Sequence, residues 1–155
     1  MSRKPNPVHE QIHATCIAVN DIGVLLLGDA GAGKSDLALR LIDEGAMLIA
    51  DDRVDLTAEA DGLTATAPKA LAGKIEVRGI GIVPLDGRNV CDRAPVRVAV
   101  RLVGADAVPR MPEAETIIWA GISVPLYRIA PFQASSTAKI RMMANGALRG
   151  ILPLP

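Results

Sequence analysis

The chain has 155 residues and a mass of 16.2 kDa, and its 50% hydrophobic and 22% charged residues favour one globular domain over a disordered or fibrous protein. Lys plus Arg and Asp plus Glu number 17 each, which argues against a nucleic-acid partner, and an aromatic content of 2% argues against base-stacking RNA recognition. The two cysteines show no metal-type spacing and predict buried thiols, and the absence of an apolar run of about 18 residues predicts a cytoplasmic protein with no membrane partner.

The N-terminal half predicts a strand, a glycine-rich loop and a helix. Residues 1–11 combine prolines with polar residues, so we expect a flexible N-terminal arm, followed by one domain over residues 12–155. Hydrophobic periodicity and turn residues predict, in chain order, a strand at 13–19, a turn at 20–23, a buried strand at 24–27, a helix at 35–44 that ends at Gly45, and a buried strand at 47–50.

The C-terminal half is predicted to be rich in strands. The expected elements are a hairpin of strands 53–59 and 63–67, a loop at 68–73, a strand at 74–78, a half-buried strand at 95–103, a short strand at 124–129, and a helix that begins after the N-cap residue Ser135. In that helix Ile140, Met143, Ala144, Ala147 and Leu148 share one face. The sequence therefore predicts an α/β fold with a mixed sheet and few helices.

A phosphate-binding loop follows the strand at 24–27. The residues Gly28, Asp29, Ala30, Gly31, Ala32, Gly33, Lys34 and Ser35 match the pattern G-x-x-x-x-G-K-[ST] between a buried strand and a helix. Glycines let successive backbone N–H groups converge on phosphate oxygens, and the helix N-terminus adds partial positive charge. Lys34 is then expected to reach the β- and γ-phosphates and the Ser35 hydroxyl to bind Mg²⁺. The sequence therefore predicts an ATP and Mg²⁺ site.

Two adjacent acids, Asp51 and Asp52, close the strand that follows this helix. Ligands of parallel sheets gather at the carboxyl ends of strands, so one carboxylate is placed to hold Mg²⁺ or its waters and the other to accept the proton of an attacking hydroxyl. The alternative interpretation is a solvated turn.

Glu76 and Arg78 project to one side of the strand at 74–78, just before Gly79-Ile80-Gly81. They fit either a metal and a phosphoryl group or an exposed ion pair. The spacing of His13 assigns it no role beyond that of a structural histidine.

These motifs in this order resemble the HPr kinase/phosphorylase family, whose members phosphorylate a serine of the phosphocarrier protein HPr with ATP and remove the phosphate by phosphorolysis. The resemblance runs from about His13 to Ala130 and includes the loop 28–35, the segment Leu48-Ile49-Ala50-Asp51-Asp52-Arg53-Val54, and Ile75-Glu76-Val77-Arg78-Gly79-Ile80-Gly81-Ile82. It implies a single P-loop kinase catalytic domain whose core resembles phosphoenolpyruvate carboxykinase.

The resemblance also implies roles for single residues. Asp51 would be the base in phosphorylation and the acid in phosphorolysis, His13 would assist it, Lys34 would bind phosphate and Arg110 would match a catalytic arginine. The expected Mg²⁺ ligands are Ser35, Glu76 and Asp52. The partner would be HPr or an HPr-like phosphocarrier, and the hexamers of the family imply a homo-oligomer.

The chain departs from the longer family members in two places. It resembles a short form that begins almost at the catalytic core, and it has Pro131-Phe132-Gln133-Ala134-Ser135-Ser136-Thr137 where longer members carry a basic, glycine-containing loop. We therefore expect clear kinase activity and weak phosphorolysis. Two alternatives remain open from the residues: a small-molecule P-loop kinase, and a regulatory module that binds ATP without transferring phosphate.

Overall fold

A curled mixed sheet of nine strands organises the structure, a computed structural model that describes residues 8–152. The strands of that sheet are β1 (His9–His13), β2 (Thr15–Val19), β3 (Ile22–Leu27), β4 (Met47–Ala50), β5 (Arg53–Glu59), β6 (Gly62–Thr66), β9 (Arg93–Leu102), β10 (Thr116–Trp119) and β11 (Ile122–Ile129). A separate two-stranded sheet is formed by β7 (Lys74–Val77) and β8 (Gly81–Pro84). The α-helices are α1 (Lys34–Asp43) and α2 (Ser136–Leu148), and short 3₁₀ turns are η1 (Lys69–Leu71), η2 (Gly87–Asn89) and η3 (Ala105–Ala107).

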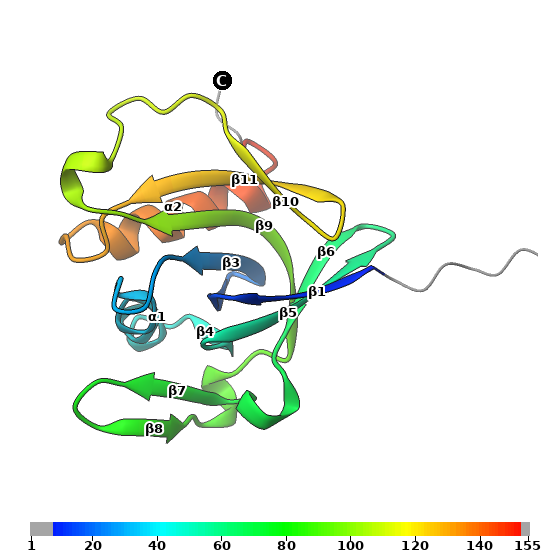
Figure 1. Cartoon of the computed structure of the whole chain (residues 1–155), viewed down its shortest axis with the longest axis vertical. Coiled ribbons are helices and arrows are strands. Elements are labelled where there is room, and N and C mark those ends of the chain that lie inside the picture. Colours follow the sequence, from blue (N-terminus) through cyan, green and yellow to red (C-terminus); the bar gives the residue numbers. More distant parts are fainter. Residues whose placement is uncertain (1–7, 153–155) are drawn as a thin grey trace, which may run out of the picture.

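The strand directions bring four carboxyl ends to one edge of the sheet. The main path runs β1-β5-β6-β9-β3-β2-β4, β11 pairs with β9, and β10 pairs with β11. Because β2 is antiparallel to both β3 and β4, and β9 is parallel to both β3 and β11, the strands β3, β4, β9 and β11 all end on the same side. In Figure 1 the arrowheads of β3, β9 and β11 point toward the side where α1 begins. This edge is where a ligand of a mixed α/β sheet is expected.

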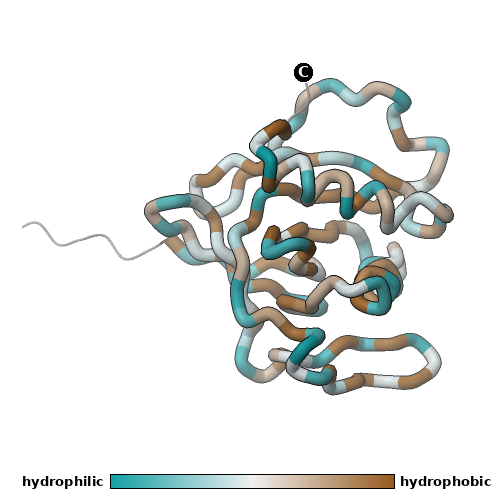
Figure 2. Tube along the Cα trace, turned by 180° about the vertical axis from the view of Figure 1, so that it is seen from behind, coloured by the Kyte–Doolittle hydropathy of each residue, from teal (hydrophilic) through white to brown (hydrophobic). Residues whose placement is uncertain are grey.

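Two apolar clusters cover the two faces of the sheet. On one face α1, α2 and β7 pack against β2, β3 and β9, with Leu37, Leu41, Ile75, Ile140 and Val98 among the buried side chains. The other cluster lies inside the curl of the sheet and includes residues of β5, β6 and β11. Figure 2 shows hydrophobic residues concentrated along the central strands. Each fully buried Leu or Ile stabilises the fold by about 1.5–3 kcal/mol. Apolar packing on both faces of the sheet therefore fixes the position of its edge.

The central elements match their predictions closely. The helix α1, the strand β4 and the hairpin of β5 and β6 lie within one residue of the predicted bounds. The prediction of one strand at 13–19 is wrong, because the segment is divided at Ala14 into the end of β1 and the strand β2, which belong to different parts of the sheet. Residues 9–11, expected in the flexible arm, pair with β5 from His9 to His13, and residues 1–7 of that arm lie outside the described residues.

The helix α2 begins after Ser135, as predicted, but it lacks the side-chain cap expected there. The N-cap residue Ser135 makes no capping hydrogen bond with its side chain. The next residue, Ser136, is fully buried; its Oγ donates to the carbonyl of Ala130 at 2.6 Å and accepts the N–H of Gln133 at 3.0 Å. Leu148, predicted on the buried face, is exposed. The polar anchor of this helix is therefore Ser136.

The two cysteines are free, as predicted. Cys16 is buried in β2 and Cys91 is half-buried before β9. Burial raises the pKa of the Cys16 thiol far above its usual range, with a smaller contribution from Cys91. The Cys16 side chain therefore stays protonated and packs as a small apolar group.

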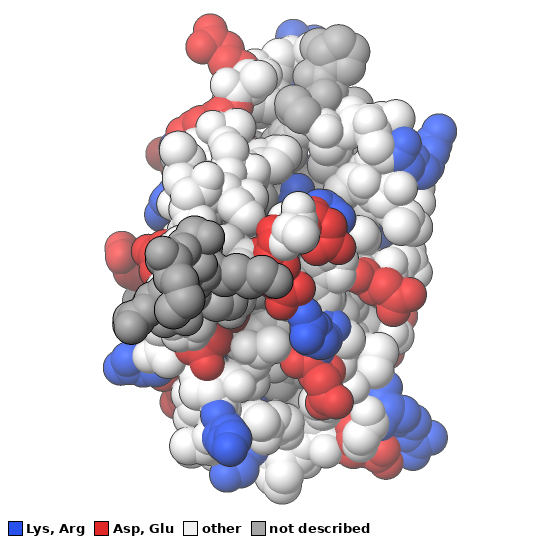
Figure 3. Space-filling view, turned by 90° about the vertical axis from the view of Figure 1, so that its right-hand side faces the viewer, with Lys and Arg blue, Asp and Glu red and all other residues white. Residues whose placement is uncertain are grey.

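Charged side chains are mixed in sign over the surface seen in Figure 3, where Lys and Arg alternate with Asp and Glu of the described residues. That face therefore presents no broad field of one sign. No helix within residues 8–152 has the length and apolar character needed to cross a membrane.

Candidate active site

The predicted phosphate-binding loop joins β3 to α1 at the carboxyl edge of the sheet. Gly31 and Gly33 have φ values of 82° and 102°, a conformation that favours glycine. A Cβ atom at Gly28 would lie 2.8 Å from the Cβ of Ala32, so this position is also restricted to glycine. The glycine spacing of the motif is therefore the spacing that this turn requires.

Lys34 folds back over the loop. Its Nζ donates to the carbonyl oxygens of Gly28 at 2.6 Å and Asp29 at 3.0 Å, and the residue is only 8% exposed. The ammonium charge is thus held at the mouth of the loop, next to the N-terminus of α1. Both charges favour an anion at this place.

Asp51 is the centre of a buried hydrogen-bond network that joins three elements. Its Oδ1 accepts the hydroxyls of Thr15 at 2.9 Å and Ser35 at 2.8 Å, and its Oδ2 accepts the backbone N–H of Glu76 at 2.9 Å. Asp51 is 5% exposed and Thr15 is fully buried. From the end of β4 the carboxylate thus ties three elements, β2, the start of α1 and β7, into one fixed arrangement.

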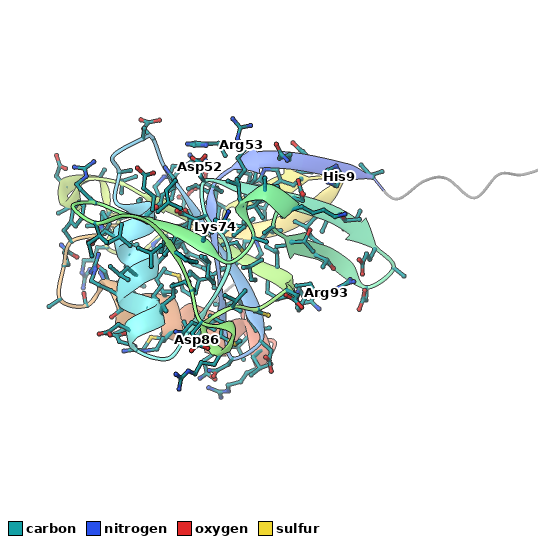
Figure 4. The ribbon with its side chains drawn as sticks, turned by 90° about the horizontal axis from the view of Figure 1, so that it is seen from below. His9, Asp52, Arg53, Lys74, Asp86 and Arg93 are labelled. Carbon is teal, nitrogen blue, oxygen red and sulfur yellow. The ribbon has the colours of Figure 1, made fainter. Side chains whose placement is uncertain are left out.

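Asp52 lies in different surroundings from its neighbour. Its φ is 69° and the N–H of Arg53 bonds to the carbonyl of Asp51 at 2.8 Å, the pattern of a γ-turn, which is a strained conformation often found at functional sites. The pairing of β1 with β5 brings His13 opposite Arg53, and the Nδ1 of His13 lies 3.3 Å from Oδ1 of Asp52. Both side chains are about half exposed. Figure 4 shows Asp52 and Arg53 on one side of the molecule, away from Asp86 and Arg93.

The remaining predicted site residues lie in two exposed segments. Glu76 and Arg78 are exposed on and after β7, and no ion pair joins them among the described residues. Arg110 is exposed in the segment between η3 and β10, and no hydrogen bond within residues 8–152 links its side chain to the phosphate-binding loop. Hydrogen bonds and close contacts therefore join the loop 28–35, the acids at 51–52, His13 and Glu76, and none of those found within residues 8–152 includes the Arg110 side chain.

The end of that segment is fixed to β11. The guanidinium of Arg128 donates to both carboxylate oxygens of Glu115, one of them at 3.0 Å. These hydrogen bonds, with a smaller coulombic attraction, lower the pKa of Glu115 and raise that of Arg128.

The donor set at the loop fits Mg²⁺. No cluster of three or more His, Cys, Asp or Glu side chains suited to a metal is found in the described part of the chain. Mg²⁺, however, is usually held by one or two carboxylates together with substrate phosphates and waters. The Ser35 hydroxyl, which Asp51 holds in place, and the exposed carboxylate of Glu76, whose backbone N–H bonds to the same Asp51, are oxygen groups of this kind.

Sequence reasoning missed two features of the site. Thr15, which positions Asp51, was visible only as a polar residue within an apolar strand. The segment after β11 was read as a departure from a basic loop, yet its Phe132 ring lies against Gly33, and the Arg40 guanidinium donates to the carbonyl of Pro131. Neither contact has a signal in local sequence, because each joins residues that are far apart in the chain.

Comparisons with known proteins agree with this geometry. A family model described as the HPr Serine kinase C-terminal domain matches residues 7–140. The HPr kinase/phosphorylase of Clostridium botulinum (strain Eklund 17B / Type B) is 47% identical over 74 residues, which cover 47% of this chain and 24% of that protein. The HPr kinase/phosphorylase of Enterococcus faecalis is 46% identical over 92 residues, which cover 58% of this chain and 29% of that protein. The matched part is thus less than a third of the length of these relatives.

A solved structure extends the similarity to almost the whole chain. The Hpr(Ser) kinase/phosphatase from Coxiella burnetii superposes with a TM-score of 0.79 at 30% identity, covering 91% of this chain and 92% of that one. The predicted fold class, an α/β P-loop kinase core resembling phosphoenolpyruvate carboxykinase with a mixed sheet and few helices, is confirmed. This chain belongs to the HPr serine kinase C-terminal domain family.

Proposed function

We propose that the chain is an ATP-dependent protein kinase that transfers the γ-phosphate of ATP to a serine of HPr or of an HPr-like phosphocarrier protein. The observation that carries the proposal is the Asp51 network, which connects Ser35 of the phosphate-binding loop to β4 and β7. A phosphate loop alone is common to many functions, but here it is linked to the segment around Glu76, whose sequence resembles the glycine-bearing segment of the family. The names of the relatives support HPr as the acceptor.

ATP and Mg²⁺ would be bound by the loop 28–35 and its surroundings. The backbone N–H groups and the Lys34 ammonium would hold the phosphates, and Ser35 and Glu76 would hold Mg²⁺, with Asp51 positioning the Ser35 hydroxyl. The ion, when bound, neutralises charge on the phosphates. The support for this is the position of the Lys34 ammonium, which its two carbonyl partners keep at the loop.

For the base, the geometry favours Asp52 over Asp51, which reverses the assignment that the family resemblance implies. Both oxygens of Asp51 are occupied by three donors, and a substrate hydroxyl cannot reach a carboxylate that is 5% exposed. Asp52 is exposed, carries the strained backbone and has His13 beside it. We propose that Asp52 accepts the proton of the serine hydroxyl and that His13 orients the Asp52 carboxylate. Asp51 would instead position the Ser35 hydroxyl for Mg²⁺.

The other family-based assignments remain proposals. Arg110 is proposed as a catalytic residue on the resemblance alone. The same source supports a homo-oligomer, and a cytoplasmic location is proposed from the sequence alone. We also propose that phosphorolysis is weak, because holding inorganic phosphate in line with a phosphoserine needs a second set of cationic groups, and residues 131–137 contain no Arg or Lys.

The test is transfer of labelled γ-phosphate from ATP to purified HPr, to HPr-like phosphocarriers and to nucleoside monophosphates. We expect label on a serine of a phosphocarrier protein, and none with a Lys34→Ala variant whose fold is intact by circular dichroism. Label on the small acceptors would identify a small-molecule kinase, and ATP binding without any transfer would identify a regulatory module. Either result would contradict the proposal.

A further inference from the structure

An exposed aromatic ring lies directly against the phosphate-binding loop. A Cβ atom at Gly33 would lie 2.7 Å from Cζ and 3.1 Å from Cε1 of Phe132, so the edge of the ring touches the backbone of the loop. The same residue is 69% exposed. Phe132 is the only Phe in the chain, and Trp119, by contrast, is buried at 7% exposure. A large apolar side chain is thus displayed to solvent beside the place proposed for the phosphates.

The segment that carries Phe132 is firmly held. It follows β11, whose carboxyl end meets those of β3 and β9 at the same edge of the sheet, and Figure 1 shows it beside the start of α1. Arg40 of α1 donates to the carbonyl of Pro131, and the buried Ser136 bonds to the segment at Ala130 and Gln133. The backbone beneath the ring is therefore fixed on both sides.

The chemistry of this place fits a nucleobase. The base of a nucleotide is joined to its phosphates through one ribose, and Phe132 is an exposed ring that touches the loop proposed to hold those phosphates. Base–aromatic stacking needs one accessible ring face and little else, and replacing such a ring by Ala weakens binding by roughly 5- to 150-fold. The segment 131–137 offers no charged side chain that would instead bind a further phosphate.

We propose that Phe132 stacks on the base of the bound nucleotide and that the fixed turn Pro131–Ser136 forms the base side of the ATP site. The inference rests on the proposed function, since it takes the loop 28–35 to hold the phosphates. It adds a residue that contributes to affinity for the nucleoside part of ATP. The base is recognised by its aromatic face, so purine nucleotides should bind more tightly than pyrimidine nucleotides.

The test compares two ligands that differ only in the nucleoside. Dissociation constants for ATP and for inorganic tripolyphosphate are measured by calorimetry with Mg²⁺ on the full chain and on Phe132→Ala, Phe132→Trp and Met142→Ala. Met142 is 76% exposed on α2 and controls for loss of an exposed apolar side chain. We expect Phe132→Ala to weaken ATP by roughly 5- to 150-fold and to leave tripolyphosphate unchanged, whereas Phe132→Trp keeps ATP affinity and Met142→Ala changes neither.

Several results, in the variants and in the unmodified chain, would each overturn the inference. Unchanged ATP affinity in Phe132→Ala would show that the ring makes no contact with the base. Equal weakening of ATP and tripolyphosphate would show that the ring only supports the loop. Normal ATP affinity with reduced transfer to the protein acceptor would assign the ring to protein docking. If the unmodified chain binds tripolyphosphate as tightly as ATP, the proposed contact with the base is wrong while the phosphate site is retained. If it binds neither ligand, the proposed function is wrong as well.

Discussion

The stability of the Asp51 network gives the sharpest structural prediction. Replacing Asp51 with Ala removes the acceptor of three hydrogen bonds and leaves the hydroxyl of the buried Thr15 and the N–H of Glu76 without their partner. Replacing Asp52 with Asn keeps a side chain that tolerates a positive φ and removes only an exposed contact with His13. The two adjacent acids should therefore differ strongly in their contribution to the free energy of unfolding.

The magnitude follows from the kind of bond that is lost. Hydrogen bonds to a charged group contribute about 1.5–3 kcal/mol each, and the cost of burying a carboxylate, several kcal/mol, offsets part of their sum. Three such bonds leave a net loss of about 2–4 kcal/mol for Asp51→Ala, a large part of the roughly 5–15 kcal/mol that stabilises a domain. An exposed ion pair contributes about 0.2–1 kcal/mol, which bounds the loss for Asp52→Asn.

Urea unfolding followed by circular dichroism measures both variants against the unmodified chain. With a slope of about 2 kcal/mol per molar urea, the middle of the range usual for small proteins, the expected loss for Asp51→Ala lowers the midpoint by roughly 1–2 M. Equal midpoints for the two variants, or a lower midpoint for Asp52→Asn, would refute the reasoning that Asp51 is the structural centre of the site.

Three further predictions concern residues outside the proposed chemistry. Ser136→Ala leaves buried polar groups unpaired and should lower the free energy of unfolding in urea by about 1–3 kcal/mol. Ser135→Ala removes no side-chain hydrogen bond and should change it by less than about 0.5 kcal/mol. Equal losses in the two variants would contradict the assignment of Ser136 as the polar anchor of α2. Iodoacetamide should label Cys91 in the native protein and leave Cys16 unlabelled until urea is added, because burial raises the pKa of Cys16; native labelling of both would contradict the packing. Hydrogen bonds from the Arg128 guanidinium lower the pKa of Glu115, so the stabilising contribution of Glu115 is present above the ordinary carboxyl pKa and is lost as the pH falls through the lowered value. The difference in free energy of unfolding between the unmodified chain and Glu115→Gln should therefore shrink in acid. A constant difference from neutral to acidic pH would count against the ion pair.

The sequence predicted the parts of the fold in which local pattern and tertiary environment agree. The loop 28–35 has glycines where the backbone takes positive φ, and α1 has its apolar residues at helical spacing, so both could be located within a residue. The strand pair β5 and β6 was predicted because polar turn residues and Gly62 separate two apolar runs.

Long-range pairing explains what could not be predicted. The residues around Ala14 give no signal for a break in the strand. The break arises from long-range pairing, because β1 pairs with β5 whereas β2 pairs with β3. The strands β8 and β10 are short, and each depends on one hairpin partner.

The same limit applies within the site. Adjacent carboxylates in a sequence are equivalent until the fold buries one and exposes the other, so the exchange of roles that we propose for Asp51 and Asp52 could be argued only from the structure.

The central claim, that Asp52 is the base beside a phosphate site organised by Asp51, is tested most directly by phosphoryl transfer in two variants. Initial rates of label transfer from ATP to the phosphocarrier are measured for Asp52→Asn and Asp51→Asn, with Mg·ATP binding measured in parallel. We predict that Asp52→Asn binds Mg·ATP normally and loses about 10²–10⁴-fold in rate, because an amide cannot accept the serine proton, and that Asp51→Asn loses Mg²⁺-dependent binding. Near-normal transfer by Asp52→Asn, together with an Asp51→Asn variant that binds Mg·ATP but transfers nothing, would contradict the account.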